Sequence, residues 1–247
     1  MLSLTYDLHL HSCLSPCGDD DMIPANIAGM ASIIGLDIIA VTDHNSCKNV
    51  PAVMEAAEEY GITVIPGMEL TTAEEVHVVC LFETLEDAMA FDAYVYDHLL
   101  PFPNKPDIFG QQQIYNSTDQ VLGEVEYLLI NATDISFDEV YELVASYNGI
   151  MIPAHVDKDT TSLLSNLGFI PPDSRFTCAE VKNLTKLDAL KEKHPYLNQC
   201  KIISNSDAHY LEQINEPVNR LHVKSRNIRD ILNALVSGSH YDPFIND

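Results

Sequence analysis

The sequence contains no tryptophan and is poor in basic residues. Its 13 lysines and arginines stand against 37 aspartates and glutamates, which gives a formal net charge of −24. Proteins that follow a nucleic-acid backbone neutralise its phosphates with many basic side chains. A stable complex with a long nucleic acid is therefore not expected. A small phosphorylated substrate stays compatible with the charge, because bound metal ions reverse the local field inside a site.

Export and membrane signals are also missing. No apolar run is long enough to cross a bilayer, and the first seven residues lack the basic start and apolar stretch of a signal peptide. The six cysteines form no Cys-x-x-Cys pair, so we expect them to be reduced. These absences predict a cytoplasmic protein without membrane contact. The hydrophobic fraction of 46% is typical of a globular chain, and 247 residues suit a single domain spanning 1–247.

Short apolar segments alternate with amphipathic ones along most of the chain. Strands are predicted at 3–8, 37–41, 62–65, 76–81, 150–152, 177–181 and 201–204. Helices are predicted at 24–34, 50–60, 85–100, 139–147 and 228–236. This rhythm favours a parallel α/β sheet, either closed into a barrel or open. Segment 101–127 breaks the pattern with several prolines and three consecutive glutamines, and we interpret it as a small insertion beside the barrel mouth.

Histidines and carboxylates recur where the predicted strands end. The motifs are Asp-Leu-His-Leu-His at 7–11, Thr-Asp-His at 42–44, Gly-Met-Glu at 67–69, Pro-Ala-His at 153–155 and Ser-Asp-Ala-His at 206–209. Parallel α/β folds build their sites at the carboxyl ends of strands, so these residues are expected to meet. Residues two apart in an extended chain point the same way, which projects His9 and His11 together, and likewise Asp207 and His209.

Side-by-side imidazoles in an apolar interior are costly unless something binds them, and a divalent cation does so. Imidazole and carboxylate together suit zinc, manganese or iron. His77 taken alone would be an ordinary core histidine, and Thr-Asp-His alone a capped turn, but the joint pattern favours a metal site. The predicted ligands are His9, His11, His44, Glu69, His77, His155, Asp207 and His209. Because one site takes about three to four protein ligands, this set predicts two or three ions.

In this order, the motifs resemble those of the polymerase and histidinol phosphatase (PHP) family, and they extend from Asp7 to His209. The resemblance implies a distorted (β/α)7 barrel, a trinuclear metal centre and phosphoester hydrolysis, and it places the family's metal ligands on the same eight residues. It also implies a ligand in the loop after the first motif. Counting without gaps puts that ligand on Asp19, with Asp20 as the alternative. An aspartate there is more similar to the branch that acts on small substrates.

The resemblance further implies attack of a metal-bridged hydroxide on phosphorus. The expected substrate is small and phosphorylated: a nucleotide, a nucleoside bisphosphate, a sugar phosphate or a short oligonucleotide. Lys158 follows His155 closely and is expected to bind a phosphate oxygen and to act in catalysis, and Arg175 is a weaker candidate for substrate binding.

Residues next to the ligands are expected to support them. Asp7 and Asp43 flank ligands and are expected to orient histidines, which makes Asp43 a further catalytic candidate. Glu180 ends a late predicted strand and is a weaker candidate to face the site.

Two other functions compete with the phosphoesterase. An amidohydrolase-type barrel also begins with His-x-His and hydrolyses C–N or C–O bonds, but it needs a strand-end lysine to bridge its metals, and the sequence has none in a matching position. A non-catalytic metal-binding domain is disfavoured because the ligand set is complete. The sequence therefore predicts a metal-dependent hydrolase acting on phosphoester bonds.

Overall fold

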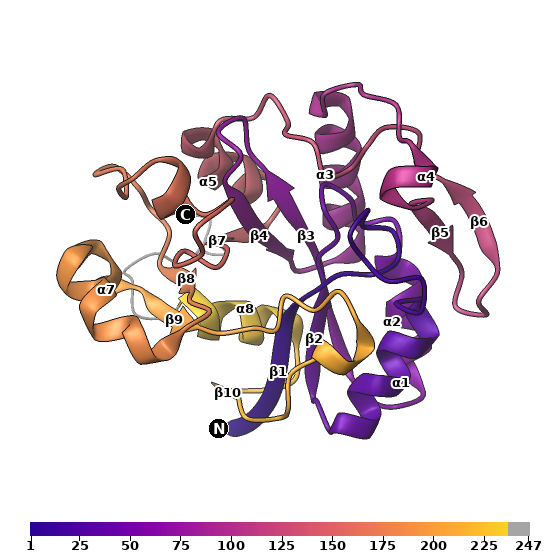
Figure 1. The fold of residues 1–247 in the computed structure, drawn as a ribbon. Helices are drawn as coiled ribbons and strands as arrows, with labels where there is room; N and C mark the ends of the chain where they lie inside the picture. Colours follow the sequence, from indigo (N-terminus) through magenta and orange to yellow (C-terminus); the bar gives the residue numbers. More distant parts are fainter. Residues whose placement is uncertain (237–247) are drawn as a thin grey trace.

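A curved sheet of six strands forms most of the barrel wall in the computed structural model, which describes residues 1–236 (Figure 1). The strand order is β10-β1-β2-β3-β4-β7, and β1, β2 and β3 run parallel. The strands are β1 (Leu2–Leu10), β2 (Ile38–Val41), β3 (Thr63–Thr71), β4 (His77–Phe82), β7 (Gly149–Pro153) and β10 (Arg220–Val223).

A second, parallel pair of strands closes the ring. It consists of β8 (Cys178–Glu180) and β9 (Lys201–Ile203). Just after β7, the Val156 amide donates to the Glu180 carbonyl at 2.9 Å, and just after β9, Ala208 forms a parallel bridge with Leu10 of β1. The barrel strands are thus β1, β2, β3, β4, β7, β8 and β9, which confirms the predicted seven-stranded α/β barrel. Strand β10 pairs antiparallel with the first half of β1, outside this ring.

Strand β4 departs from the predicted parallel arrangement. It runs antiparallel to both neighbours, β3 and β7. Only residues 72–76 connect β3 to β4, and a parallel pair would need a crossover of a dozen or more residues. The expectation of a parallel sheet was therefore wrong for this strand. The reversal places His77, the first residue of β4, opposite Thr71, the last residue of β3, so that β4 begins where its neighbour ends.

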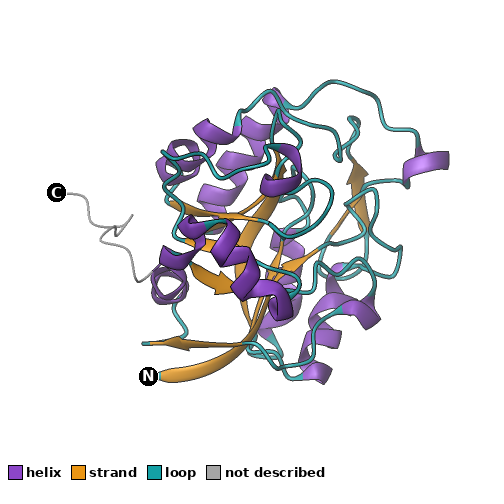
Figure 2. Cartoon of the chain, turned by 60° about the vertical axis from the view of Figure 1, so that its left-hand side comes forward, coloured by secondary structure: helices purple, strands orange, loops and turns teal. Residues whose placement is uncertain are grey.

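Helices surround the strands on the outside of the barrel (Figure 2). Proline at the first position of α1 suits a helix start, and the chain leaves this helix through Gly35 at a φ of 88°, a left-handed conformation that glycine adopts without strain. The predicted helices 24–34 and 228–236 agree with the observed ranges. The longer helices are α1 (Pro24–Ile34), α2 (Val50–Glu58), α3 (Leu85–His98), α5 (Phe137–Ser146) and α8 (Ile228–Val236).

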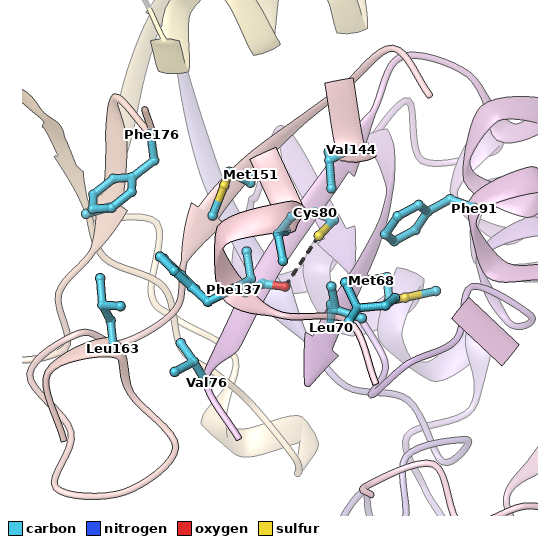
Figure 3. Packing of buried hydrophobic residues seen from close by; sticks show 14 of the residues in the cluster. Met68, Leu70, Val76, Cys80, Phe91, Phe137, Val144, Met151, Leu163 and Phe176 are labelled. Carbon is cyan, nitrogen blue, oxygen red and sulfur yellow. Dashed lines mark hydrogen bonds between the residues drawn. The ribbon is translucent and has the colours of Figure 1, made fainter. Parts of the chain in front are cut away.

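The largest apolar cluster fills the space between the β3–β4 hairpin and helices α3 and α5. Phe91 of α3 and Val144 of α5 both lie near Cys80 of β4, and Phe137 lies on the other side of it (Figure 3). Each large side chain fully removed from water contributes about 2 kcal/mol. This packing holds the hairpin, and with it Glu69 and His77, in a fixed position.

Segment 101–127 lies between α3 and α5 in the sequence, and it extends from the barrel on the side of α3, at the right of Figure 1. It contains α4 (Pro106–Phe109) and an antiparallel hairpin of β5 (Gln113–Tyr115) and β6 (Val121–Glu124). Asn49 attaches the hairpin to the start of α2, since its amide donates to the Gln113 carbonyl at 3.2 Å and its side-chain oxygen accepts the Tyr115 N–H at 2.9 Å. Short helices α6 (Leu163–Asn166) and α7 (Leu187–Lys193) flank β8. Among residues 1–236, no helix is both long and apolar enough to cross a membrane.

Candidate metal centre

Six strands bring the eight predicted ligands to one end of the barrel. His9 and His11 come from the end of β1, His44 follows β2, and Glu69 lies near the end of β3. The neighbouring imidazole rings have centroids 4.3–5.8 Å apart. The other members are His77 at the start of β4, His155 after β7, and Asp207 and His209 after β9. The convergence expected from the sequence is therefore present in the structure.

Glu69 stands at the centre of this cluster and is 1% exposed. Its two carboxylate oxygens lie within 3.3 Å of ring nitrogens from five different histidines, all of them buried. A carboxylate carries one charge and about four lone-pair positions, so it cannot satisfy five imidazoles at once. The distances are 3.2 Å to His9, 3.3 Å to His11, 3.1 Å to His44, 3.0 Å to His77 and 3.1 Å to His155.

Two residues of the cluster have an unusual backbone. His155 has a φ of 29° and Asp207 a φ of 54°, both in the left-handed region that side chains other than glycine rarely adopt. Such conformations cost on the order of 1 kcal/mol or more and persist only where the surroundings impose them. Here they turn the chain sharply after β7 and β9, so that both side chains face the cluster.

Glu180 fixes the orientation of His9. The His9 Nδ1 atom lies 3.0 Å from a Glu180 oxygen, and an ionised carboxylate can only accept, so this nitrogen carries the proton. Glu180 also accepts the Asn205 amide at 2.7 Å and the His155 N–H at 3.2 Å. His9 therefore directs Nε2 toward the cluster, which is the orientation that metal-binding histidines adopt.

Ser15 performs the same task for His11. Its hydroxyl proton goes to the Asp43 carboxylate at 2.7 Å, so the oxygen accepts from the His44 N–H at 3.1 Å and from the His11 Nδ1–H at 3.0 Å. The Nε2 lone pair of His11 is then directed at the cluster. Asp43 also accepts the Ser12 N–H and hydroxyl at 2.7 and 2.6 Å, so it reaches His11 only through Ser15.

Asp7 acts on the backbone near the ligands. It accepts the N–H groups of Ser206 and Asn215, each at 3.1 Å, and so fixes the segment that carries Asp207. Asp7 and Asp43 thus support the cluster through the backbone and through Ser15, whereas Glu69 lies among the imidazole rings themselves.

The charges of the cluster are strongly coupled. Burial alone would raise the pKa of Glu69, but the surrounding His77, His9 and His44 lower it well below its usual value, so Glu69 is ionised. Burial opposes the charged form of His9 as well, yet Glu180, Glu69 and Asp207 raise its pKa well above the usual range. For His209, burial and the nearby His11 lower the pKa to about 4.

The donor set fits divalent cations. Three buried ring or carboxylate atoms, His44 Nδ1, Glu69 Oε2 and His155 Nδ1, have no hydrogen-bond partner with acceptable geometry. Buried polar atoms of this kind are rare without a ligand. Three groups of residues place their donor atoms within 4.8 Å of one another: His11, His44 and His209; His9, His11 and Glu69; His44, Glu69 and His77. Imidazole and carboxylate in such groups are suited to zinc, manganese or iron.

Two lysines approach the edge of the cluster at Asp207. Lys158 Nζ donates to Asp207 Oδ2 at 2.9 Å, and Lys182 Nζ lies 3.9 Å from the same oxygen. Partial burial would lower the pKa of Lys158, but Asp207 raises it, so the ammonium stays charged. Lys158 was expected at the site, whereas Lys182 was not singled out, because it belongs to no motif. The sequence does place Lys182 two residues after Glu180, the last residue of β8, and this position at a strand end was the available indication of a role at the site.

The remaining predicted residues lie elsewhere or at the margin. Arg175 forms an ion pair with Glu142 and stacks on the Tyr141 ring at 4.4 Å, at the opposite end of β8 from Glu180, so the structure does not bring it to the cluster. Asp19 is adjacent to the cluster through its backbone, since its N–H donates to the His209 carbonyl at 2.9 Å. Its carboxylate accepts the Asp21 N–H at 3.0 Å within the same loop.

The PHP domain model matches residues 7–239. The chain belongs to the PHP family. This family consists of metal-dependent phosphoesterases, in agreement with the predicted family and enzyme class.

Individual PHP relatives share only parts of the sequence. An uncharacterised protein of Methanocaldococcus jannaschii is 32% identical over 76 residues, which cover 28% of this chain and 44% of that protein. A protein of Haemophilus influenzae named 5'-3' exoribonuclease is 34% identical over 79 residues, 31% of this chain and 28% of that one. The chain thus matches less than half the length of either relative.

A solved structure agrees over nearly the whole fold. A lesion-specific endonuclease from Pyrococcus furiosus superposes with a TM-score of 0.68 at 19% identity, covering 97% of this chain and 57% of that chain. This likeness establishes the PHP barrel architecture.

Proposed function

We propose that this PHP protein is a metal-dependent hydrolase that cleaves a phosphoester bond of a small phosphorylated substrate. The observation that carries the proposal is the position of Glu69 among five buried imidazoles within 3.3 Å. One carboxylate cannot balance such a set, and cations shared between Glu69 and the histidine nitrogens would. The family's activity and the site's composition therefore point to the same chemistry.

Two or three divalent ions, of manganese, zinc or iron, are proposed to occupy the three donor groups. Each of His11, His44 and Glu69 belongs to two of these groups, which supports a site that would hold more than one ion. His155 and Asp207, which follow β7 and β9, complete the set of metal ligands. Asp19 would join this set by adopting another side-chain rotamer. When bound, the ions would supply an activated water and positive charge for the phosphate oxygens.

The protein's own side chains would orient the reaction around this charge. Glu180 and Ser15 hold the rings of His9 and His11 with their Nε2 atoms inward. Lys158 and Lys182 present ammonium groups at the rim, where they can bind phosphate oxygens and stabilise charge that develops on them. We assign Lys158 as the residue of this pair that contacts the reacting phosphate, since its ammonium lies within hydrogen-bond distance of Asp207.

The substrate is proposed to be a nucleotide, a nucleoside bisphosphate, a sugar phosphate or the end of a short oligonucleotide. Two of the 13 basic residues, Lys48 and Lys105, lie in the first 150 positions. This part of the chain therefore has too few basic side chains to bind a long phosphate backbone. The Haemophilus influenzae relative carries the name of an exoribonuclease, which supports a terminal nucleotide of a short strand as one acceptable substrate.

An amidohydrolase reaction receives less support. It would need a lysine between the metal ligands, whereas both lysines near the cluster contact the outer oxygen of Asp207. A non-catalytic role is disfavoured by the complete ring of donors around Glu69.

The test joins metal analysis to phosphate release. Purified protein is expected to bind manganese or zinc. It should release phosphate from at least one nucleotide, bisphosphate or sugar phosphate, or release a nucleotide from the end of a short oligonucleotide. His9→Ala and Glu69→Gln should abolish turnover while circular dichroism stays unchanged. His98→Ala is the matched control, since this histidine pairs with Asp134 on the surface. Full turnover by His9→Ala would overturn the proposal.

A further inference from the structure

A cavity of about 520 Å³ lies beside the metal centre, between the loop that follows β7 and helix α7. This volume is in the range of pockets that hold small ligands. Val156, Leu164 and Leu190 are among its apolar lining residues. The cavity is formed by one face of α7, which stands beside β8 and β9 in Figure 1, and by residues that directly follow His155.

Lys158 belongs to both the cavity and the metal centre. It lines the cavity, while its Nζ atom donates to Asp207 Oδ2 at 2.9 Å and its backbone N–H donates to the His155 carbonyl at 2.8 Å. A substrate whose scissile phosphate lies at the cluster would therefore have the cavity within reach on the other side of this lysine. The cavity is therefore a place for the remainder of that substrate.

The loop that forms the cavity wall is fixed by hydrogen bonds. Asp157 accepts the N–H groups of Lys182 and Asn183, each at 2.7 Å, and the Ser162 hydroxyl donates to the Lys158 carbonyl at 2.7 Å. The shape of the cavity therefore does not depend on a bound molecule. These bonds also engage the carboxylate of Asp157, which would otherwise repel an anion.

Positive charge gathers around this cavity in a chain that is otherwise strongly acidic. Lys158, Lys186 and Lys193 line it, against Asp157 and Asp159. His194 also lines the cavity but adds no charge at neutral pH, because burial and the nearby Lys193 lower its pKa. More than half of the 13 basic residues fall between positions 158 and 201: Lys158, Arg175, Lys182, Lys186, Lys191, Lys193 and Lys201. In a protein of net charge −24, an apolar pocket bordered by three lysines is suited to a ligand with an organic body and an anionic end.

We propose that this cavity is a second substrate subsite, in which Lys186 and Lys193 bind a phosphate other than the one that is hydrolysed. The inference rests on the proposed function and extends it to specificity. Substrates with two phosphates separated by a nucleoside, whether a bisphosphate or a short oligonucleotide, would use both places. A monophosphate would use only the metal centre.

The test compares two probes and two variants. Adenosine 3′,5′-bisphosphate and adenosine 5′-monophosphate are titrated into the protein, and phosphate release is measured for both. In Lys186→Gln/Lys193→Gln, the KM and Kd for the bisphosphate should rise about tenfold, with kcat and the monophosphate constants unchanged. Lys191→Gln is the control, because this lysine lies on α7 but not on the cavity wall. A phosphorylated trinucleotide in the same assay separates a bisphosphate preference from an oligonucleotide preference.

The outcomes separate the subsite from the proposed function. Phosphate release with no effect of the double variant on the bisphosphate refutes the subsite and leaves the function standing. Binding of the bisphosphate that depends on Lys186 and Lys193, without turnover of any phosphoester, supports the subsite and refutes the function. An equal loss for both adenosine probes also refutes the subsite, since it would indicate a general loss of positive charge.

Discussion

Glu180 shows how a buried residue outside any motif can set the chemical state of a predicted ligand. It is fully buried and receives hydrogen bonds from the His9 ring, the Asn205 amide and the His155 backbone. Through these bonds one carboxylate holds β1, β7 and the segment after β9 against β8. Its negative charge also increases the basicity of the His9 nitrogen that faces the cluster.

Substitution of this carboxylate by an amide tests that role. Glu180→Gln should lower the affinity for manganese or zinc by about 10- to 100-fold, because His9 loses a charged partner and its tautomer is no longer imposed. Equilibrium dialysis with metal analysis measures the change. Glu142→Gln provides the control, as Glu142 pairs with Arg175 on the surface. An unchanged metal affinity in Glu180→Gln would show that His9 is oriented by other contacts.

The sequence identifies ligands more readily than their supports. His9, His11 and Asp207 stand in short motifs at strand ends, where residue type and spacing carry the signal. Ser15 and Lys182 acquire their roles only when the chain folds: Ser15 lies between Asp43 and His11, and Lys182 approaches Asp207 from a neighbouring strand. Such roles depend on contacts between distant positions, which one sequence does not record.

At the scale of elements, the β3–β4 hairpin explains both a success and an error of prediction. The apolar runs that define the two strands are clear, so their existence could be predicted. Their direction could not be derived from the alternation of strands and helices. The predicted connection, 66–75, was too long to indicate a hairpin, whereas β3 in fact extends to Thr71 and leaves only residues 72–76. The reversal keeps His77 at the same barrel end as Glu69, so the structure brings the two residues together although the predicted direction was wrong.

Gly67, two residues before Glu69, allows β3 to pack closely against Thr42 and Leu81. A Cβ atom at this position would lie 2.8 Å from Thr42 Cγ2 and 2.9 Å from Leu81 Cδ2. Gly67→Ala should therefore destabilise the protein by about 1–3 kcal/mol, measured by urea denaturation, and displace Glu69. The matched control is Gly123→Ala on β6, where an added Cβ meets nothing within 4 Å. Equal stability of the two variants would contradict the close packing of β3.

Asp37 links the first two strands to the start of α8 and gives a pH-dependent prediction. Partial burial would raise the pKa of its carboxyl, but hydrogen bonds from the Thr5 N–H and hydroxyl and from Arg226 lower it. A lowered pKa in the folded state stabilises the protein above the usual pKa and loses that effect as pH falls.

Asp37→Asn should therefore reduce the free energy of unfolding by about 1 kcal/mol at neutral pH, a modest figure because the group is partly exposed. The difference from the wild type should shrink as pH falls below about 4, because the carboxyl is protonated first in the unfolded state and then, at its lowered pKa, in the native state. Urea denaturation at several pH values measures both. A difference that does not change with pH would assign the effect of Asp37 to packing instead of charge.

On the scale of the whole molecule, the negative charge is unevenly distributed. The first 150 residues carry 25 acidic and two basic residues, whereas 12 acidic and 11 basic residues nearly balance after position 150. The cluster joins both regions, since Glu69 comes from the acidic part and Lys158 from the nearly neutral part. A small anionic substrate would therefore approach from the side of α7, where the repulsion is least.

Cations at the metal centre should also contribute to the stability of the whole barrel, because the donors come from strands along its entire circumference. A ligand at one hundred times its Kd stabilises the native state by about 2.7 kcal/mol, and a domain of this size gains about 2–4 °C in Tm for each kcal/mol. Saturating manganese should thus raise the Tm by about 5–10 °C over protein treated with a chelator. In Glu69→Gln the shift should nearly vanish, whereas His98→Ala should retain it. If chelated and manganese-loaded wild-type protein melted at the same temperature, the ring of imidazoles around Glu69 would have to be stabilised by protonation alone, without a cation.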